Sequence, residues 1–214
     1  EQQTSGNPRQ LTTTRALQVF QVMRVGSVIL TSILLAKSSL SIADIGAYET
    51  LLYIGTTLTF FWVNGLLMGM PPVYSNLNSD DRKAFIFNNF LVFCGISAGL
   101  FLLLFFGEKV ATPLFSGQPE VPYFRLLCLY LLFNLPTFPV EYYYLLHEKP
   151  RYIVGWGIAT FGLYVLAMFL PIVLGYGLAG GLTALVILSA LKLHWTAGLV
   201  SIYGKAQWRG DLIR

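Results

Sequence analysis

Residues 19–37, VFQVMRVGSVILTSILLAK, are apolar over nearly their whole length but include one permanent charge, Arg24. A bilayer core of about 30 Å is crossed by about 20 apolar residues in a helix. Charged side chains inside such helices are rare, and they usually face the interior of a bundle or a water-filled cavity. The stretch therefore predicts a membrane helix, and it makes the surroundings of Arg24 the central question about this chain.

The composition of the whole chain agrees with a membrane protein. Of its 214 residues, 55% are hydrophobic and 11% are charged, whereas about 25% of the residues in soluble domains are charged. The mean hydropathy is +0.64. A chain of this length has room for about six membrane helices and for no further soluble domain.

Polar or Gly/Pro-rich clusters divide the chain into six apolar segments of spanning length. None alternates with the period of two that a barrel strand needs, so helices are predicted. The predicted fold is all-α, a polytopic bundle of six transmembrane helices within residues 14–204, with a polar tail at 1–13 and a basic tail at 205–214. The first ten residues are polar and begin without Met, which predicts a processed tail or an internal cut. The six segments are residues 14–36, 45–69, 84–106, 123–147, 152–174 and 177–203.

The distribution of Lys and Arg predicts the orientation of the bundle. The positive-inside bias places the segments that carry more of these residues in the cytoplasm. Nine lie in the two tails and in the second and fourth loops, and three lie at the other loops. Both termini are therefore predicted to be cytoplasmic. The nine are Arg9, Arg15, Arg82, Lys83, Lys149, Arg151, Lys205, Arg209 and Arg214, and the three are Lys37, Lys109 and Arg125.

In the first predicted helix, polar residues share one side with Arg24. At 100° per residue, Gln21, Ser27 and Thr31 occupy the same half of the circumference as the guanidinium. This pattern predicts that the four residues line a water-filled cavity. Two alternatives stay open: an Arg24 that is paired in a tightly packed bundle, and an interfacial Arg24 in a helix that begins deeper in the chain.

Polar residues also mark the second and fourth predicted helices. In the second, Glu49, Tyr53 and Asn64 recur at helical spacing and are predicted to face the same cavity. In the fourth, Asn134 precedes two prolines and Glu141 follows them. Prolines interrupt helical hydrogen bonding, and discontinuous helices often form transporter sites. A simple packing kink and a solvated, interfacial Glu141 remain alternatives.

Other residues have simpler interpretations. Asp44 is expected to stabilise the start of the second helix, and Lys192 is expected to extend towards the cytoplasmic interface. Gly180 and Gly181 are expected to let helices approach closely. The cysteines, Cys94 and Cys128, lie in apolar runs and are expected to pack as small hydrophobic side chains.

No catalytic or nucleotide-binding motif is found in the sequence, which contains no Ser/His/Asp set, HExxH, P-loop or GxGxxG pattern. A transporter without enzymatic activity, cofactor or metal is therefore predicted. A cation in a cavity with apolar walls favours an anionic substrate. Asp44, Glu49 and Glu141 are the candidates for coupling transport to an ion.

Several stretches resemble the first half of bacterial polysaccharide flippases of the Wzx type, in the multidrug/oligosaccharidyl-lipid/polysaccharide exporter superfamily. They are QVMRVGSVILTSILLAKSSLSIADIGAYETLLYI, VNGLLMGMPPVYS, EYYYLLHEKPRYIVGWGI and LGYGLAGGLTAL. Arg24 falls where the related lipid II flippases carry a cavity arginine, and Asp44 falls near one of their acids. Asn64 stands where an acid is often found, which weakens any role carried over to it.

The resemblance implies a function for the complete protein. Such flippases move a polyprenyl-pyrophosphate-linked oligosaccharide from the inner to the outer leaflet of the bacterial inner membrane by alternating access, between two six-helix bundles. The expected partners are this lipid-linked oligosaccharide, membrane lipids, a second six-helix half or another copy, and polysaccharide polymerase machinery. Two other functions stay open: a cation-coupled multidrug or metabolite antiporter of the same superfamily, and a non-transporting scaffold for polysaccharide assembly.

Overall fold

The computed structural model describes residues 12–208, and over this range it contains helices and no strand. The predicted all-α class is confirmed, and each of the six predicted apolar segments coincides with helical structure. The elements are α1 (Thr13–Ala36), α2 (Ile42–Ser75), α3 (Ser79–Phe106), α4 (Glu108–Ser116), α5 (Phe124–Asn134), the 3-10 turn η1 (Leu135–Thr137), α6 (Val140–Leu146), α7 (Pro150–Val173) and α8 (Gly177–Tyr203).

Four of these helices are each long and apolar enough to cross a membrane, namely α1, α3, α7 and α8. A fifth candidate is α2, which bends by 40° between Ile42–Phe60 and Trp62–Ser75. The segment predicted as the fourth span is divided into α5, η1 and α6. The described residues therefore form a membrane protein with four or five candidate spans.

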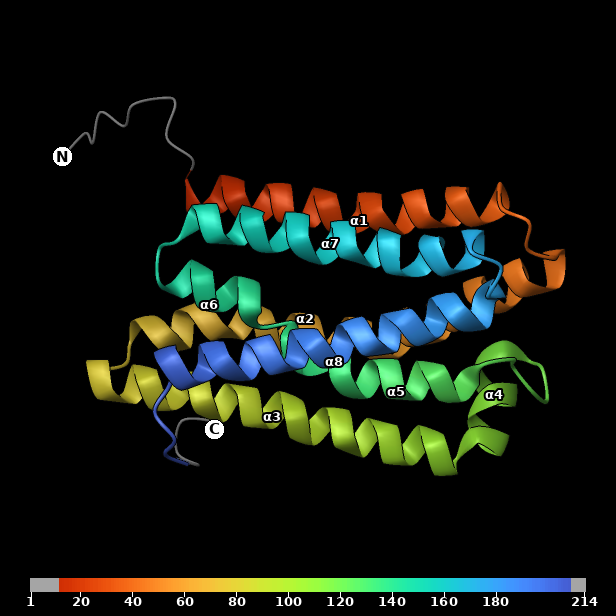
Figure 1. The fold of residues 1–214 in the computed structure, drawn as a ribbon. Helices are drawn as coiled ribbons and strands as arrows, with labels where there is room; N and C mark the ends of the chain where they lie inside the picture. Colours follow the sequence, from red (N-terminus) through yellow and green to blue (C-terminus); the bar gives the residue numbers. More distant parts are fainter. Residues whose placement is uncertain (1–11, 209–214) are drawn as a thin grey trace.

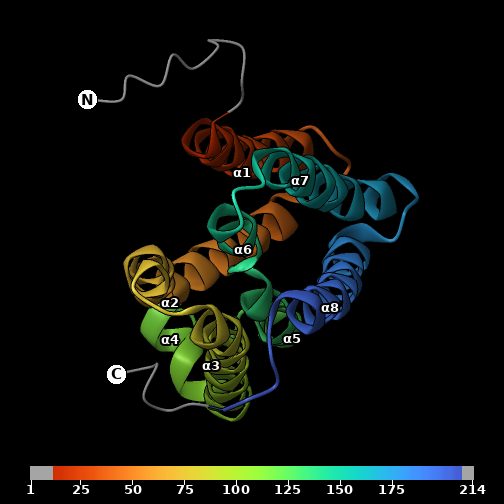
Figure 2. The same ribbon diagram turned by 90° about the vertical axis from the view of Figure 1, so that its left-hand side faces the viewer.

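The long helices lie side by side along one axis, and the start of α1 and the end of α8 are at the same end of the bundle (Figure 1). Viewed along that axis, α1 and α7 form one side and α3 and α4 the other, with α2 and α8 between them and α6 near the centre (Figure 2). The helix pairs α1 with α7, α7 with α8, and α5 with α8 are in close contact.

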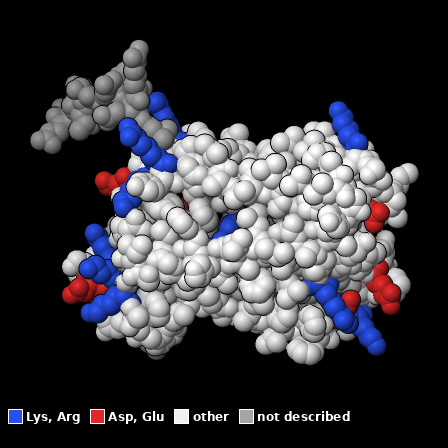
Figure 3. Space-filling model, in the orientation of Figure 1, with Lys and Arg blue, Asp and Glu red and all other residues white. Residues whose placement is uncertain are grey.

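Charged side chains gather at the two ends of the molecule, and the surface between them is almost uncharged on the face shown in Figure 3. The end that holds the start of α1 is called the basic end here. Lys149 donates a 2.7 Å hydrogen bond to the Tyr203 hydroxyl at this end, which raises the pKa of that lysine. Of the nine basic residues predicted on this side, Arg9, Arg209 and Arg214 lie outside the described residues. The six that the structure describes are Arg15, Arg82, Lys83, Lys149, Arg151 and Lys205.

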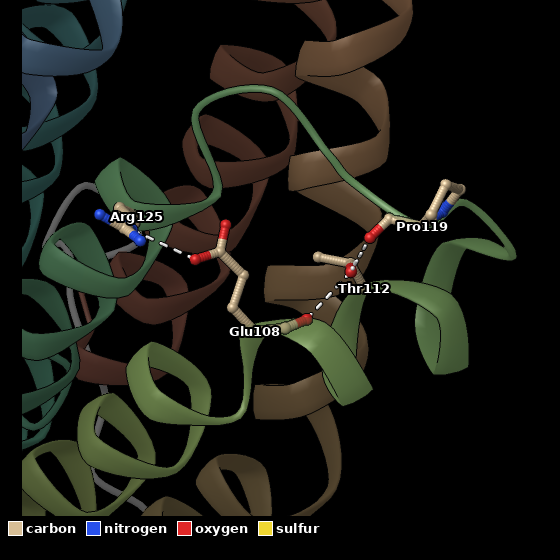
Figure 4. A network of polar contacts seen from close by, with 4 residues as sticks. All are labelled: Glu108, Thr112, Pro119 and Arg125. Carbon is tan, nitrogen blue, oxygen red and sulfur yellow. Dashed lines mark hydrogen bonds and ion pairs between the residues drawn. The ribbon is translucent and has the colours of Figure 1, made fainter.

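A polar network joins α4, the loop that follows it and α5 at the opposite end (Figure 4). The Arg125 Nε atom donates to Glu108 Oε2 at 3.2 Å. The buried Thr112 hydroxyl lies 2.9 Å from the carbonyl oxygens of both Glu108 and Pro119. These contacts fix the short helix α4 and the loop that follows it, so the start of α5 is held in place.

A close contact between α7 and α8 depends on glycine. A Cβ atom on Gly181 would lie 2.7 Å from the carbonyl oxygen of Met168, closer than van der Waals contact allows. The expected role of Gly181 in close helix packing is confirmed. The two cysteines are free, with Cys128 buried and Cys94 half-buried, as expected of small hydrophobic side chains.

The interruption between α5 and α6 is supported by a serine from another helix. Proline has no N–H group, so Pro136 cannot donate to the carbonyl of Leu132, four residues before it. The hydroxyl of buried Ser97, on α3, lies 2.6 Å from that oxygen and 3.1 Å from the carbonyl oxygen of Leu131. The interruption is therefore tied to α3 by a specific polar contact.

Replacing Ser97 by alanine should lower the free energy of unfolding by about 1–2 kcal/mol, because a buried carbonyl loses its partner. Ser189→Ala is the matched control. The Ser189 hydroxyl is equally buried and bonds the Leu185 carbonyl oxygen of its own helix, which already accepts a backbone N–H. We expect Ser189→Ala to change stability by less than about 0.5 kcal/mol. Unfolding in detergent measures both variants, and equal losses would contradict a supporting role for Ser97.

Candidate functional site

A cavity of about 440 Å³ lies inside the bundle, between α1, α2, α5, α6, α7 and α8. Its walls are mainly aliphatic and aromatic, with a few polar groups among them. A hollow with a basic surface inside it is visible at the middle of the molecule (Figure 3). The polar and charged side chains on the wall include Arg24, Ser27, Asn64, Asn134, Glu141 and Lys192.

Arg24 is the twelfth of the 24 residues of α1 and so lies at the middle of that helix. Its side chain is on the cavity wall and is exposed. Among residues 12–208, no carboxylate oxygen lies within 4.0 Å of the guanidinium, and the ion pair that is found joins Arg125 and Glu108. Arg24 therefore has donors available for an anionic ligand in the cavity.

Lys192 is a second cation in the same cavity, and the expectation that it extends towards the cytoplasmic interface is wrong. Its Nζ atom donates a 2.8 Å hydrogen bond to Asn134 Oδ1. Lys192 follows the start of α8 by 15 residues, but the helix continues for 11 residues more, to Tyr203. The lysine is thus near the middle of α8, too deep for its side chain to reach the end of the bundle. Ser189, three residues before Lys192 and also on the cavity wall, is the polar residue in the sequence that could have indicated that this face of α8 lines the cavity.

Glu141 supplies the acid of the site. Its side chain is only 4% exposed and lies on the cavity wall, and its carboxylate interacts electrostatically with both Arg24 and Lys192. The alternative of a solvated, interfacial Glu141 is therefore wrong.

Hydrogen-bonded tyrosines extend the polar part of the wall. The hydroxyls of Tyr48 on α2 and Tyr164 on α7 lie 3.1 Å apart. The Asn134 amide donates to the Tyr130 hydroxyl at 3.1 Å while its oxygen accepts from Lys192. Aromatic rings with hydroxyl groups offer both apolar faces and hydrogen-bonding groups to a ligand in the cavity.

The structure brings together some of the residues predicted for the cavity and separates others. Arg24, Ser27, Asn64 and Asn134 line it, as does Glu141, which was predicted for ion coupling. The other four cavity candidates lie elsewhere, because the polar face predicted for each helix was too wide. Thr31 is buried with its hydroxyl on the Ser27 carbonyl, Tyr53 is 59% exposed, Glu49 is exposed, and Gln21 is outside the cavity wall.

Asp44 is at the start of α2, outside the cavity. The Ser41 hydroxyl accepts the Asp44 N–H at 3.1 Å and donates to Asp44 Oδ2 at 2.7 Å. Ser41 is therefore the N-cap of α2, and the Asp44 carboxylate holds the capping hydroxyl in place. This arrangement agrees with the expected stabilising role of Asp44 at the helix start.

Comparisons of the chain with family models, curated proteins and solved structures found no match. The fold and the cavity define a polytopic α-helical membrane protein with a charged internal site.

Proposed function

We propose that this protein is a membrane transporter that moves a lipid-linked oligosaccharide, carried on a polyprenyl pyrophosphate, from the inner to the outer leaflet. The observation that carries the proposal is the pair of cations, Arg24 and Lys192, in a cavity with otherwise largely apolar and aromatic walls. Water-poor surroundings strengthen the attraction between these cations and a diphosphate. The tyrosines and Trp156 on the same wall suit the sugar.

The same proposal accounts for the arrangement of the helices. It takes α1, α2, α3, the divided segment α5–η1–α6, α7 and α8 as six spans, with the basic end in the cytoplasm of a bacterial cell. A cavity of 440 Å³ suits a drug-sized ligand and is small for an oligosaccharide. A second six-helix half, or a second copy, would complete the passage, with the cavity as one of its walls.

One observation favours a second candidate, a cation-coupled antiporter. Glu141 is a buried acid on the cavity wall, and acids at such positions often carry a coupled proton or cation. A scaffold without transport activity is the third candidate. In a scaffold, two cations at the middle of the bundle would lower stability without contributing to function.

Reconstitution tests these candidates. The protein as its gene encodes it would be placed in liposomes that contain a polyprenyl-diphosphate oligosaccharide, and access of an external glycosidase to the inner-leaflet sugar would be followed over time. A flippase exposes the inner-leaflet pool within minutes, whereas protein-free liposomes and a scaffold leave it protected. An antiporter leaves it protected too, but it moves a small organic cation against a proton gradient.

A further inference from the structure

A second, smaller cavity lies at the basic end, outside the central site and lined by different residues. It has a volume of about 330 Å³ and lies between the first turns of α3 and the last turns of α8. The volume is at the lower end of the range for ligand pockets. Its lining residues are Phe87, Phe90, Ala197, Val200, Ser201, Gly204 and Ala206. We call this cavity the α3–α8 slot.

The lining of the slot suits an alkyl chain. Ser201 is its only polar side chain, and its hydroxyl already donates to the Gly198 carbonyl at 2.7 Å. The lining residues on α8 extend from Ala197 to Ser201, which corresponds to about 6 Å along the helix axis, and Gly204 and Ala206 continue the lining beyond the end of the helix. An apolar channel of this length offers no hydrogen bond to a polar ligand, but it accepts part of an acyl chain.

Two lysines mark the end of the slot that is nearest to the basic end. Lys83 is one helical turn before Phe87 and so lies on the same face of α3. Lys205 is between the lining residues Gly204 and Ala206, and its N–H donates to the Lys83 carbonyl at 3.1 Å. Both side chains are exposed, and among residues 12–208 neither forms an ion pair with a carboxylate. The nearest acids along the chain are Asp80 and Asp81, in the first turn of α3.

We propose that the α3–α8 slot is a binding site for an anionic phospholipid of the surrounding bilayer. One acyl chain occupies the slot, and the headgroup phosphate lies between Lys83 and Lys205. Such a lipid would brace the segment after α8 against α3, since that segment is fixed by the same backbone contact between the two lysines. The site does not depend on the function proposed for the central cavity.

Native mass spectrometry of the purified full protein tests the site, with phosphatidylglycerol and phosphatidylcholine titrated separately. The wild type should bind one phosphatidylglycerol more tightly than the others and more tightly than phosphatidylcholine. The double variant Lys83→Ala/Lys205→Ala should weaken this binding by about 30-fold, since each lysine near an anionic headgroup contributes about fivefold. Lys37→Ala/Lys109→Ala, which removes two exposed lysines at the opposite end, is the matched control and should not change it.

Filling the slot gives an independent test. Ser201→Phe adds a ring at an exposed lining position and should displace the tightly bound lipid, whereas Leu191→Phe, at an exposed position of α8 outside the slot, should not. Size-exclusion elution checks that each variant is folded. Wild-type phosphatidylglycerol affinity in either the lysine double variant or Ser201→Phe would overturn the proposal, as would equal wild-type affinity for the two lipids.

Discussion

Replacing Arg24 by alanine should reduce translocation of the lipid-linked oligosaccharide by about 10- to 100-fold. A hydrogen bond to a charged group contributes about 1.5–3 kcal/mol, and a factor of ten corresponds to about 1.4 kcal/mol. Arg24→Lys should recover part of the activity, because an ammonium retains the charge but loses the forked geometry that pairs with phosphate. The glycosidase-access assay in liposomes measures translocation by the wild type, Arg24→Ala and Arg24→Lys.

The fold should survive this change. Within residues 12–208 the guanidinium makes no ion pair, and removing a charge from the middle of a membrane helix favours insertion. Arg15→Ala is the matched control, since it removes one positive charge from the same helix outside the cavity. Full translocation by Arg24→Ala, with Arg15→Ala equally active, would remove Arg24 from the proposed mechanism.

The helical segments could be predicted from the sequence because the bilayer imposes a length on them. The predicted segment 177–203 has the same bounds as α8, and 14–36 differs from α1 by one residue. The division of the fourth segment followed from two prolines, each of which removes a backbone donor. The short helix α4 was not predicted, since residues 107–122 were interpreted as a loop. The nine residues of α4 are too few to show the hydropathy pattern of a membrane-spanning helix.

The candidate site was predicted only in part, because helical periodicity defines the angle around one helix and says nothing about its neighbours. Arg24 was found since a charge in an apolar run is conspicuous. Glu49 and Tyr53 share a helix with Asn64 but lie off the cavity wall. Asn134 was identified from its helical spacing with Tyr130 and Glu141, but its role as the acceptor for Lys192 depends on the packing of α5 against α8. No pattern within a single helix contains that contact.

Replacing Lys192 by methionine should both destabilise the protein and reduce translocation. The change removes the donor to Asn134 and one of the two cations that interact with buried Glu141. Among residues 12–208 no carboxylate lies within ion-pair distance of Lys192, so the loss comes mainly from its hydrogen bond to buried Asn134. A hydrogen bond to a charged group contributes about 1.5–3 kcal/mol, and we expect a loss of about 2–3 kcal/mol. Unfolding in detergent measures it, and Lys109→Met, an exposed lysine outside the cavity, should change stability by less than about 0.5 kcal/mol.

The double variant Lys192→Met/Glu141→Gln separates the structural part of this effect from the functional part. Glutamine removes the buried charge that Lys192→Met leaves undercompensated, so the double variant should regain part of the lost stability, while the missing hydrogen bond to Asn134 accounts for the rest. Translocation should stay low, because the diphosphate still lacks its second cation. If the double variant recovered both stability and translocation, Lys192 would serve only as the counter-ion of Glu141, and Arg24 would be the single cation that receives the substrate.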